Sequence, residues 1–195
     1  MQWESYVLKI TPVTMYKSFI IVLLAAYWIP VHAQKFTTEK TSVVFYSHAS
    51  IEDIKATNLK TSGLFDAGTG DIAFVVPVNE FQFAKSLMQE HFNEKYMETE
   101  KYPRSTFQGK ITGYDPSATG EQKVVAKGKL TIHGVTQTVE IPGTIAKQGD
   151  GLMMNSVFVV KLEDYKIQIP KLLWQNIAEQ VEVTLNFSFK PNNKS

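Results

Sequence analysis

The sequence predicts a single domain made mainly of β-strands, with one amphipathic helix inserted near the middle of the chain. Apolar and polar residues alternate along several short segments, and clusters of turn-forming residues separate these segments. About eight strands with one apolar face each must bury those faces, either between two packed sheets or inside one closed barrel. The chain has 195 residues, which is enough for one domain with a sizeable core.

The N-terminal residues 1–33 have the features of a cleaved export signal. Lys17 precedes an apolar run from Phe19 to Ile29, and Val31-His32-Ala33 resembles a small-x-small cleavage site. The run is well short of the roughly 20 residues that span a bilayer, so we expect no stable membrane insertion. Residues 34–195 would then form the mature domain, periplasmic or secreted. Met1 and Met15 are both candidate start sites, because the stretch before Met15 is long for a signal.

The strand predictions follow from two-residue periodicity. The clearest case is "VEVTLNFSF" at 181–189, in which five apolar side chains alternate with polar ones. In "DIAFVVPV" at 71–78, Ile72, Phe74, Val76 and Val78 share one face, and Pro77 belongs near a strand end. Further strands are expected around Phe45, Phe107 and Phe158, with turns at 66–71, 114–121 and 147–151.

The predicted helix covers about residues 79–95. Asn79 has the character of an N-cap, with Gln82 three residues later. From Phe81 to Tyr96, apolar residues recur at spacings of three and four, which is typical of one buried helix face. Such a helix could cover the end of a barrel or pack across a sheet.

The segment "GKLTIHGVTQTVEIPG" at 128–143 predicts a β-hairpin that contains His133. With Gly134-Val135 as a type II′ loop, His133 would face Thr136 and Lys129 would face Glu140. The polar residues then share one side of the sheet, so we expect His133 to have a structural role and to point to solvent or to a neighbouring strand.

Composition and motifs argue against several function classes. The formal charge is +1, which gives no basic field for nucleic acid. Cysteine is absent, so disulfides and thiol chemistry are excluded. His48, His91 and His133 lie far apart in the sequence without metal-binding spacing, and no nucleophile elbow or phosphate-binding loop is present. We therefore expect no enzyme activity, no metal and no cofactor.

Two segments, "GKLTIHGVTQTVEIP" at 128–142 and "MQEHFNEKYMETEKYPRSTFQGKI" at 88–111, together resemble the YceI-like family. "GKLTIHGVTQTVEIP" is similar to its glycine- and threonine-rich hairpin motif. "MQEHFNEKYMETEKYPRSTFQGKI" is similar to its second motif, a helix with a histidine followed by "YP" and a strand. The resemblance covers most of Phe36 to Phe189. It implies a lipocalin-like antiparallel β-barrel of about eight strands, usually exported, and some relatives hold a polyisoprenoid in the barrel interior.

The resemblance therefore implies a carrier for a long amphipathic lipid, such as an isoprenoid quinone or a polyprenyl phosphate. The alternative is a filled structural or partner-binding barrel without a small-molecule ligand, with the stress-related role suggested for relatives; whether two barrels pair into a homodimer stays open. Gly109, Gly113, Ala126 and Gly128 would either leave space inside the barrel or mark bulges. For the polar head we expect His91, Lys101 and Arg104, the last being the only arginine in the chain. For the apolar lining we expect Phe45, Phe74, Phe81, Met88, Phe92, Phe107, Ile111, Leu130 and Ile132.

Overall fold

The computed structural model of the chain describes residues 34–48, 53–168 and 179–192. The expected export signal at 1–33 and the alternative start sites lie outside these residues. The described part of the chain belongs to one compact unit.

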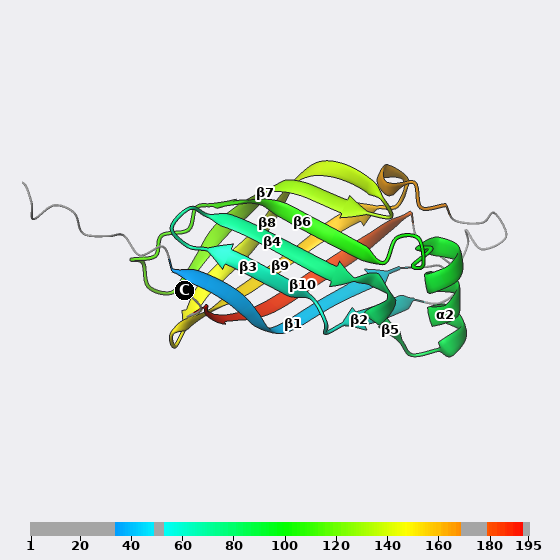
Figure 1. The fold of residues 1–195 in the computed structure, drawn as a ribbon, viewed down its shortest axis with the longest axis horizontal. Coiled ribbons are helices and arrows are strands. Elements are labelled where there is room, and N and C mark those ends of the chain that lie inside the picture. The colour runs from blue at the N-terminus through cyan, green and yellow to red at the C-terminus, as the bar shows by residue number, and fades with distance from the viewer. Residues whose placement is uncertain (1–33, 49–52, 169–178, 193–195) are drawn as a thin grey trace, which may run out of the picture. The chain divides into compact units, whose positions relative to one another are not determined.

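The described residues form a closed antiparallel β-barrel, as predicted (Figure 1). Eight strands make the barrel in the order β10-β9-β8-β7-β6-β4-β3-β1, and β10 pairs with β1 to close it. The short strands β2 and β5 extend the sheet beside β1. The strand bounds are β1 Lys35–Ser47, β2 Ile54–Asn58, β3 Ser62–Asp66, β4 Asp71–Pro77, β5 Gln82–Phe83, β6 Arg104–Thr112, β7 Glu121–Ile132, β8 Val135–Gln148, β9 Gly151–Lys161 and β10 Gln180–Pro191.

The mid-chain helix is present, but it begins later than predicted. The α-helix α2 spans Ser86–His91 and continues as one turn of π-helix, η3, at Phe92–Tyr96. Asn79 is not an N-cap. It lies in a short 3-10 turn, η2 (Val78–Glu80), and the next residues form β5, which pairs with β2. Phe81 is only 8% exposed, and its ring packs against Phe45 and Phe92. It is thus buried without being part of the helix that the spacing predicted.

The alternation correctly identified the inner faces of the strands. In β4, Ile72, Phe74 and Val76 point into the barrel, and the strand ends at Pro77 as expected. In β10, the apolar residues from Val181 to Phe187 also face the interior, and Phe189 is 2% exposed. Burial of these side chains, at about 25 cal/mol per Å² of apolar surface, is the main force that closes the barrel.

The predicted hairpin register is wrong by two residues. His133-Gly134, and not Gly134-Val135, forms the two-residue loop, with positive φ angles of 51° and 73°. These angles suit a type I′ turn, whose twist matches that of the flanking strands. Thr131 therefore faces Thr136, with hydroxyl oxygens 2.8 Å apart. A shift of two residues keeps every side chain on its predicted face, so the alternation gives no warning of it.

His133 has structural contacts, as expected, but it points neither to solvent nor to a neighbouring strand. Its side chain is 11% exposed, its ring centroid lies 4.5 Å from that of Tyr102, and Nε2 lies 2.9 Å from Glu98 Oε2. Nδ1 lies 3.3 Å from the carbonyl oxygen of Tyr165. His133 thus joins the hairpin to the segment after α2 and to η4 (Glu163–Tyr165).

Two inner-face glycines allow β6 and β7 to approach closely. Gly109 pairs with Gly128, and a Cβ on Gly109 would lie 2.3 Å from the carbonyl oxygen of Lys127. A Cβ on Gly128 would lie 2.3 Å from the carbonyl oxygen of Gln108. Gly109 and Gly128 therefore allow the two backbones to come close and do not leave space in the barrel. Gly113 adopts a positive φ of 89°. Of the four small residues expected to leave space, Ala126 alone lines the interior cavity.

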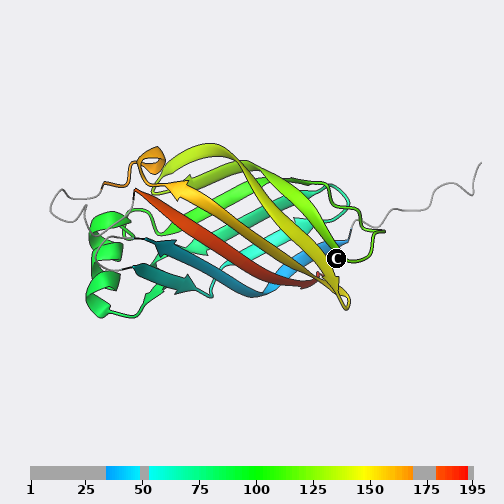
Figure 2. The same cartoon turned by 180° about the vertical axis from the view of Figure 1, so that it is seen from behind.

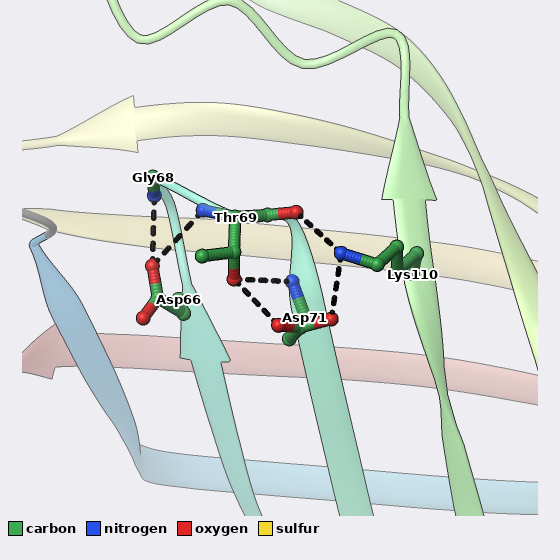
Figure 3. A network of polar contacts seen from close by, with 5 residues as sticks. All are labelled: Asp66, Gly68, Thr69, Asp71 and Lys110. Atoms are coloured by element: carbon green, nitrogen blue, oxygen red, sulfur yellow. Dashed lines mark hydrogen bonds and ion pairs between the residues drawn. The ribbon is translucent and has the colours of Figure 1, made fainter.

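The end of the barrel opposite α2 is tied by a polar network at the β3–β4 turn (Figure 3). Asp66 Oδ1 accepts hydrogen bonds from the backbone N–H groups of Gly68 and Thr69, at 2.9 and 3.1 Å. The Thr69 hydroxyl donates to Asp71 Oδ2 at 2.7 Å. Lys110 Nζ, from β6, contacts both Asp71 Oδ1 at 3.0 Å and the carbonyl oxygen of Thr69 at 3.1 Å. The network fastens this turn to β6.

Candidate ligand cavity

The barrel is filled with side chains at one end and hollow toward α2. Phe36, Phe65, Leu152 and Phe189 are each 1–3% exposed and pack the filled end. Toward α2, a cavity of about 480 Å³ occupies the interior. Most of the side chains that line it are apolar, so the cavity suits a hydrophobic occupant rather than ordered water.

Phenylalanine rings form the floor of the cavity. The ring centroids of Phe74 and Phe187 are 4.7 Å apart, and both residues line the cavity. The Phe189 ring lies with its centroid 6.1 Å from that of Phe74 and is not part of the lining. These rings, together with Ile72, Ile111 and Ile145 of the lining, lie where the hollow part of the barrel passes into the filled part.

An aromatic cluster lies at the end of the cavity near α2. It combines Phe45 of β1, Phe81 after η2, Phe83 of β5 and Phe92 of η3, with ring centroids 4.9–5.7 Å apart. Such stacked, tilted and edge-on pairs add stability beyond the area that they bury. The cluster connects the helix to the barrel wall and gives the cavity an aromatic surface there.

All nine residues expected for the apolar lining face this cavity, together with many that the sequence did not single out. The additional ones come mainly from β9 and β10, such as Phe158, Val160 and Leu185. Their two-residue alternation is visible in the sequence and could have identified them. Those that were expected are Phe45, Phe74, Phe81, Met88, Phe92, Phe107, Ile111, Leu130 and Ile132.

Of the three residues expected at the polar head, only one lines the cavity. His91, on α2, lines the cavity. Lys101 and Arg104 do not belong to the lining. Lys101 Nζ lies 4.9 Å from the centre of the Tyr102 ring, and Arg104 is exposed at the start of β6, opposite Pro77. Only His91 is therefore placed to touch a molecule inside the barrel.

Two polar regions of the lining were missed by the sequence reasoning. Near α2, Tyr96 and Ser105 line the cavity beside His91. Burial raises the pKa of Tyr96, so its hydroxyl stays neutral and can donate a hydrogen bond at neutral pH. In the barrel wall, Thr144 and Asn155 line the cavity where β8 meets β9. No sequence pattern marked these residues, because their importance depends on how the strands pair.

The described residues contain no group of three or more histidine, aspartate or glutamate side chains that could hold a metal ion. Within the same ranges, no helix combines the length and hydropathy required to cross a bilayer.

Comparisons with known proteins identify the family. Residues 35–189 match the YceI-like domain. The fold is similar to that of BcnA from Burkholderia cenocepacia, at 20% identity and a TM-score of 0.66, over 76% of this chain and 95% of that chain. It is also similar to a polyisoprenoid binding domain from Saccharophagus degradans implicated in plant cell wall breakdown, at 15% identity and a TM-score of 0.70, over 80% of this chain and 98% of that one.

A third solved structure, the YceI protein of Campylobacter jejuni, aligns at 18% identity and a TM-score of 0.56, over 75% of this chain and 90% of that chain. No curated protein matches the chain. At these identities the solved structures establish the fold alone. The match to the family covers most of the chain, from the first strand of the barrel to the last. The chain therefore belongs to the YceI-like domain family.

Proposed function

We propose that this protein is an exported carrier that holds a long amphipathic lipid of the isoprenoid type in the hollow part of its barrel, without catalysis. The observation that carries this proposal is the apolar cavity of about 480 Å³. Ligand sites commonly measure about 300–1,000 Å³ and combine an apolar lining with a few polar groups. The cavity has this size and composition.

The energetic cost of an empty cavity supports the proposal. Without a ligand, the apolar side chains that line this cavity of about 480 Å³ are in contact with water, which is unfavourable for apolar surface. A lipid chain that displaces water from this surface recovers about 25 cal/mol per Å² of apolar area. The hollow part thus favours a bound molecule over a purely structural barrel.

The arrangement of the lining suggests how the lipid would lie. The apolar chain would extend along the barrel from the aromatic cluster to the floor at Phe74 and Phe187. The polar head would lie near α2, where His91 and Tyr96 offer hydrogen bonds. We assign Lys101 and Arg104 to the outer part of the same head site, because both flank the Tyr102-Pro103 segment between η3 and β6. A branched isoprenoid chain is favoured by the wide aromatic surface and by the similarity in fold to the polyisoprenoid binding domain of Saccharophagus degradans.

Native mass spectrometry followed by organic extraction tests the proposal. Protein purified from its own host should carry a polyprenyl species, and Phe107→Trp should reduce its amount because Phe107 lines the cavity at 7% exposure. Leu64→Trp is the matched control, since Leu64 is 55% exposed on the barrel's outer face. Arg104→Ala should weaken retention of a charged headgroup, whereas Lys129→Ala should not. A folded, exported protein whose mass equals that of the bare chain would contradict the carrier function.

A further inference from the structure

The barrel wall is split between β8 and β9. The two strands pair only from Thr144–Asn155 to Gln148–Gly151. In the described part of the chain, residues 135–143 of β8 have ladder partners only on β7, and residues 156–161 of β9 have them only on β10. Along these lengths the facing edges of β8 and β9 share no backbone ladder. We call the space between residues 135–143 and 156–161 the lateral slit.

The sequence at the fork explains why pairing stops there. Pro142 has no N–H group and cannot donate to a ladder. The Ser156 hydroxyl instead donates a hydrogen bond to the Pro142 carbonyl oxygen at 2.6 Å. The next residue, Gly143, lies so close to β9 that a Cβ would be 2.6 Å from the carbonyl oxygen of Asn155. One side-chain bond and one tight backbone contact therefore mark the start of the lateral slit.

The cavity reaches the lateral slit. Pro142 is exposed to solvent and yet lines the cavity, as do Gly143 and Ser156. A wall residue with both properties shows that the cavity extends to the outer surface of the wall at this point. On the outer side of β9, Val157 and Val159 are 54% and 56% exposed. They give the lateral slit an apolar lip.

The short helix η4 connects β8 and β9 at the far end of the lateral slit (Figure 2). Gln137 Nε2, on β8, donates to the carbonyl oxygen of Asp164 at 2.8 Å, and His133 contacts the carbonyl oxygen of Tyr165. Tyr165 is 3% exposed, and the flanking residues Leu162 and Ile167 line the cavity. These side-chain contacts, which we call the clasp, hold η4 against β8 where the two strands are not paired with each other.

We propose that the lipid enters and leaves the barrel sideways through the lateral slit, and that the clasp on η4 limits its opening. This inference rests on the proposed carrier function. A long chain that moves sideways does not have to be threaded lengthwise past the aromatic cluster. Widening the lateral slit breaks the few side-chain hydrogen bonds of the clasp, each contributing about 0.5–1.5 kcal/mol, whereas separating two paired strands breaks a whole ladder.

Cross-linking across the lateral slit tests the route, and the absence of native cysteine makes it selective. Glu140→Cys and Val159→Cys face each other if the Thr144–Asn155 register is continued. A reducible bismaleimide would join them. The matched control joins Lys127→Cys to Glu140→Cys, which are true register partners on β7 and β8. The readout is transfer of NBD-geranylgeraniol between the protein and phosphatidylcholine vesicles.

The slit-crosslinked protein should exchange the probe at least about tenfold more slowly than the control, and reduction should restore the rate. Equal rates in the two crosslinked proteins, with binding intact, would overturn sideways entry and leave the carrier function standing. If the reduced variants and the unmodified protein both fail to bind the probe, the carrier function itself fails, and the route with it. Gln137→Met, which removes one clasp bond, should exchange the probe faster; an unchanged rate would overturn the role of η4.

Discussion

Ala126→Leu should stabilise the lipid-free protein and weaken its binding of lipid at the same time. Ala126 lies on the inner face of β7, between Ile111 of β6 and Ile141 of β8. All three residues line the cavity. A leucine at this position adds carbon atoms to the wall of a space that is otherwise empty, and it removes that space from the lipid.

The expected magnitude follows from the number of added carbons. Leucine has three more side-chain carbons than alanine, and burying each is worth about 0.8 kcal/mol, or about 2 kcal/mol in total. The lipid loses a similar amount of contact. Since about 1.4 kcal/mol corresponds to a factor of ten, its dissociation constant should rise roughly 30-fold.

Urea unfolding of the lipid-free protein and titration with NBD-geranylgeraniol would measure the two effects separately. Ala73→Leu is the control, because Ala73 lies on the outer face of β4, with Leu64 and Gln108 as register neighbours. It should leave lipid affinity unchanged. If Ala126→Leu destabilises the protein while affinity stays the same, then the space beside Ala126 neither accepts a side chain nor holds the lipid, and the reasoning fails.

Two further predictions concern the frame of the barrel. Gly109→Ala should destabilise the protein by about 1–3 kcal/mol in urea unfolding, because the new Cβ would lie 2.3 Å from the Lys127 carbonyl oxygen; an unchanged midpoint would refute this. The hydrogen bond from Thr69 lowers the pKa of Asp71 most, and the hydrogen bond from Lys110 is the second cause. The stability that these contacts contribute is therefore fully present above the unfolded-state pKa of about 3.9. It is lost as the pH falls through the lower folded-state pKa. Lys110→Met should raise the pKa of Asp71 in an NMR titration, and superimposable titration curves would contradict this.

Periodicity in the sequence predicted most of the barrel, because each strand has one apolar face and a sheet with such faces must close or stack. It did not predict the short strands β2, β3 and β5. In β3, Ser62–Asp66, a glycine and an exposed leucine weaken the alternation. In β5 only Gln82 and Phe83 pair, through contacts with β2 that no local pattern records.

The start of the helix shows a limit of spacing rules. Phe81 fits the apolar stripe of a helix as well as it fits an irregular turn, and the packing of its ring against Phe45 decides between the two. The hairpin register shows another limit. A two-residue shift preserves both faces, so only the backbone angles at His133 and Gly134 determine it.

The apolar lining of the candidate site followed from the same alternation, whereas its polar parts did not. Ser156 and Pro142 are adjacent only because β8 and β9 meet there, which is a property of the tertiary fold. The prediction of Lys101 and Arg104 rests on their charge, and charge alone does not determine whether a side chain points into the barrel. In this protein neither residue reaches the lining.

The phenylalanine floor makes the barrel a blind tube. Behind Phe74 and Phe187, the residues Phe36, Phe65, Leu152 and Phe189 are each 1–3% exposed, so side chains pack the barrel at that end. A bound chain can therefore extend only as far as these rings, and any additional length must remain on the side of α2 or of the lateral slit. The position of these rings would then limit the length of chain that the barrel holds, so the protein would select lipids by chain length as well as by chemistry.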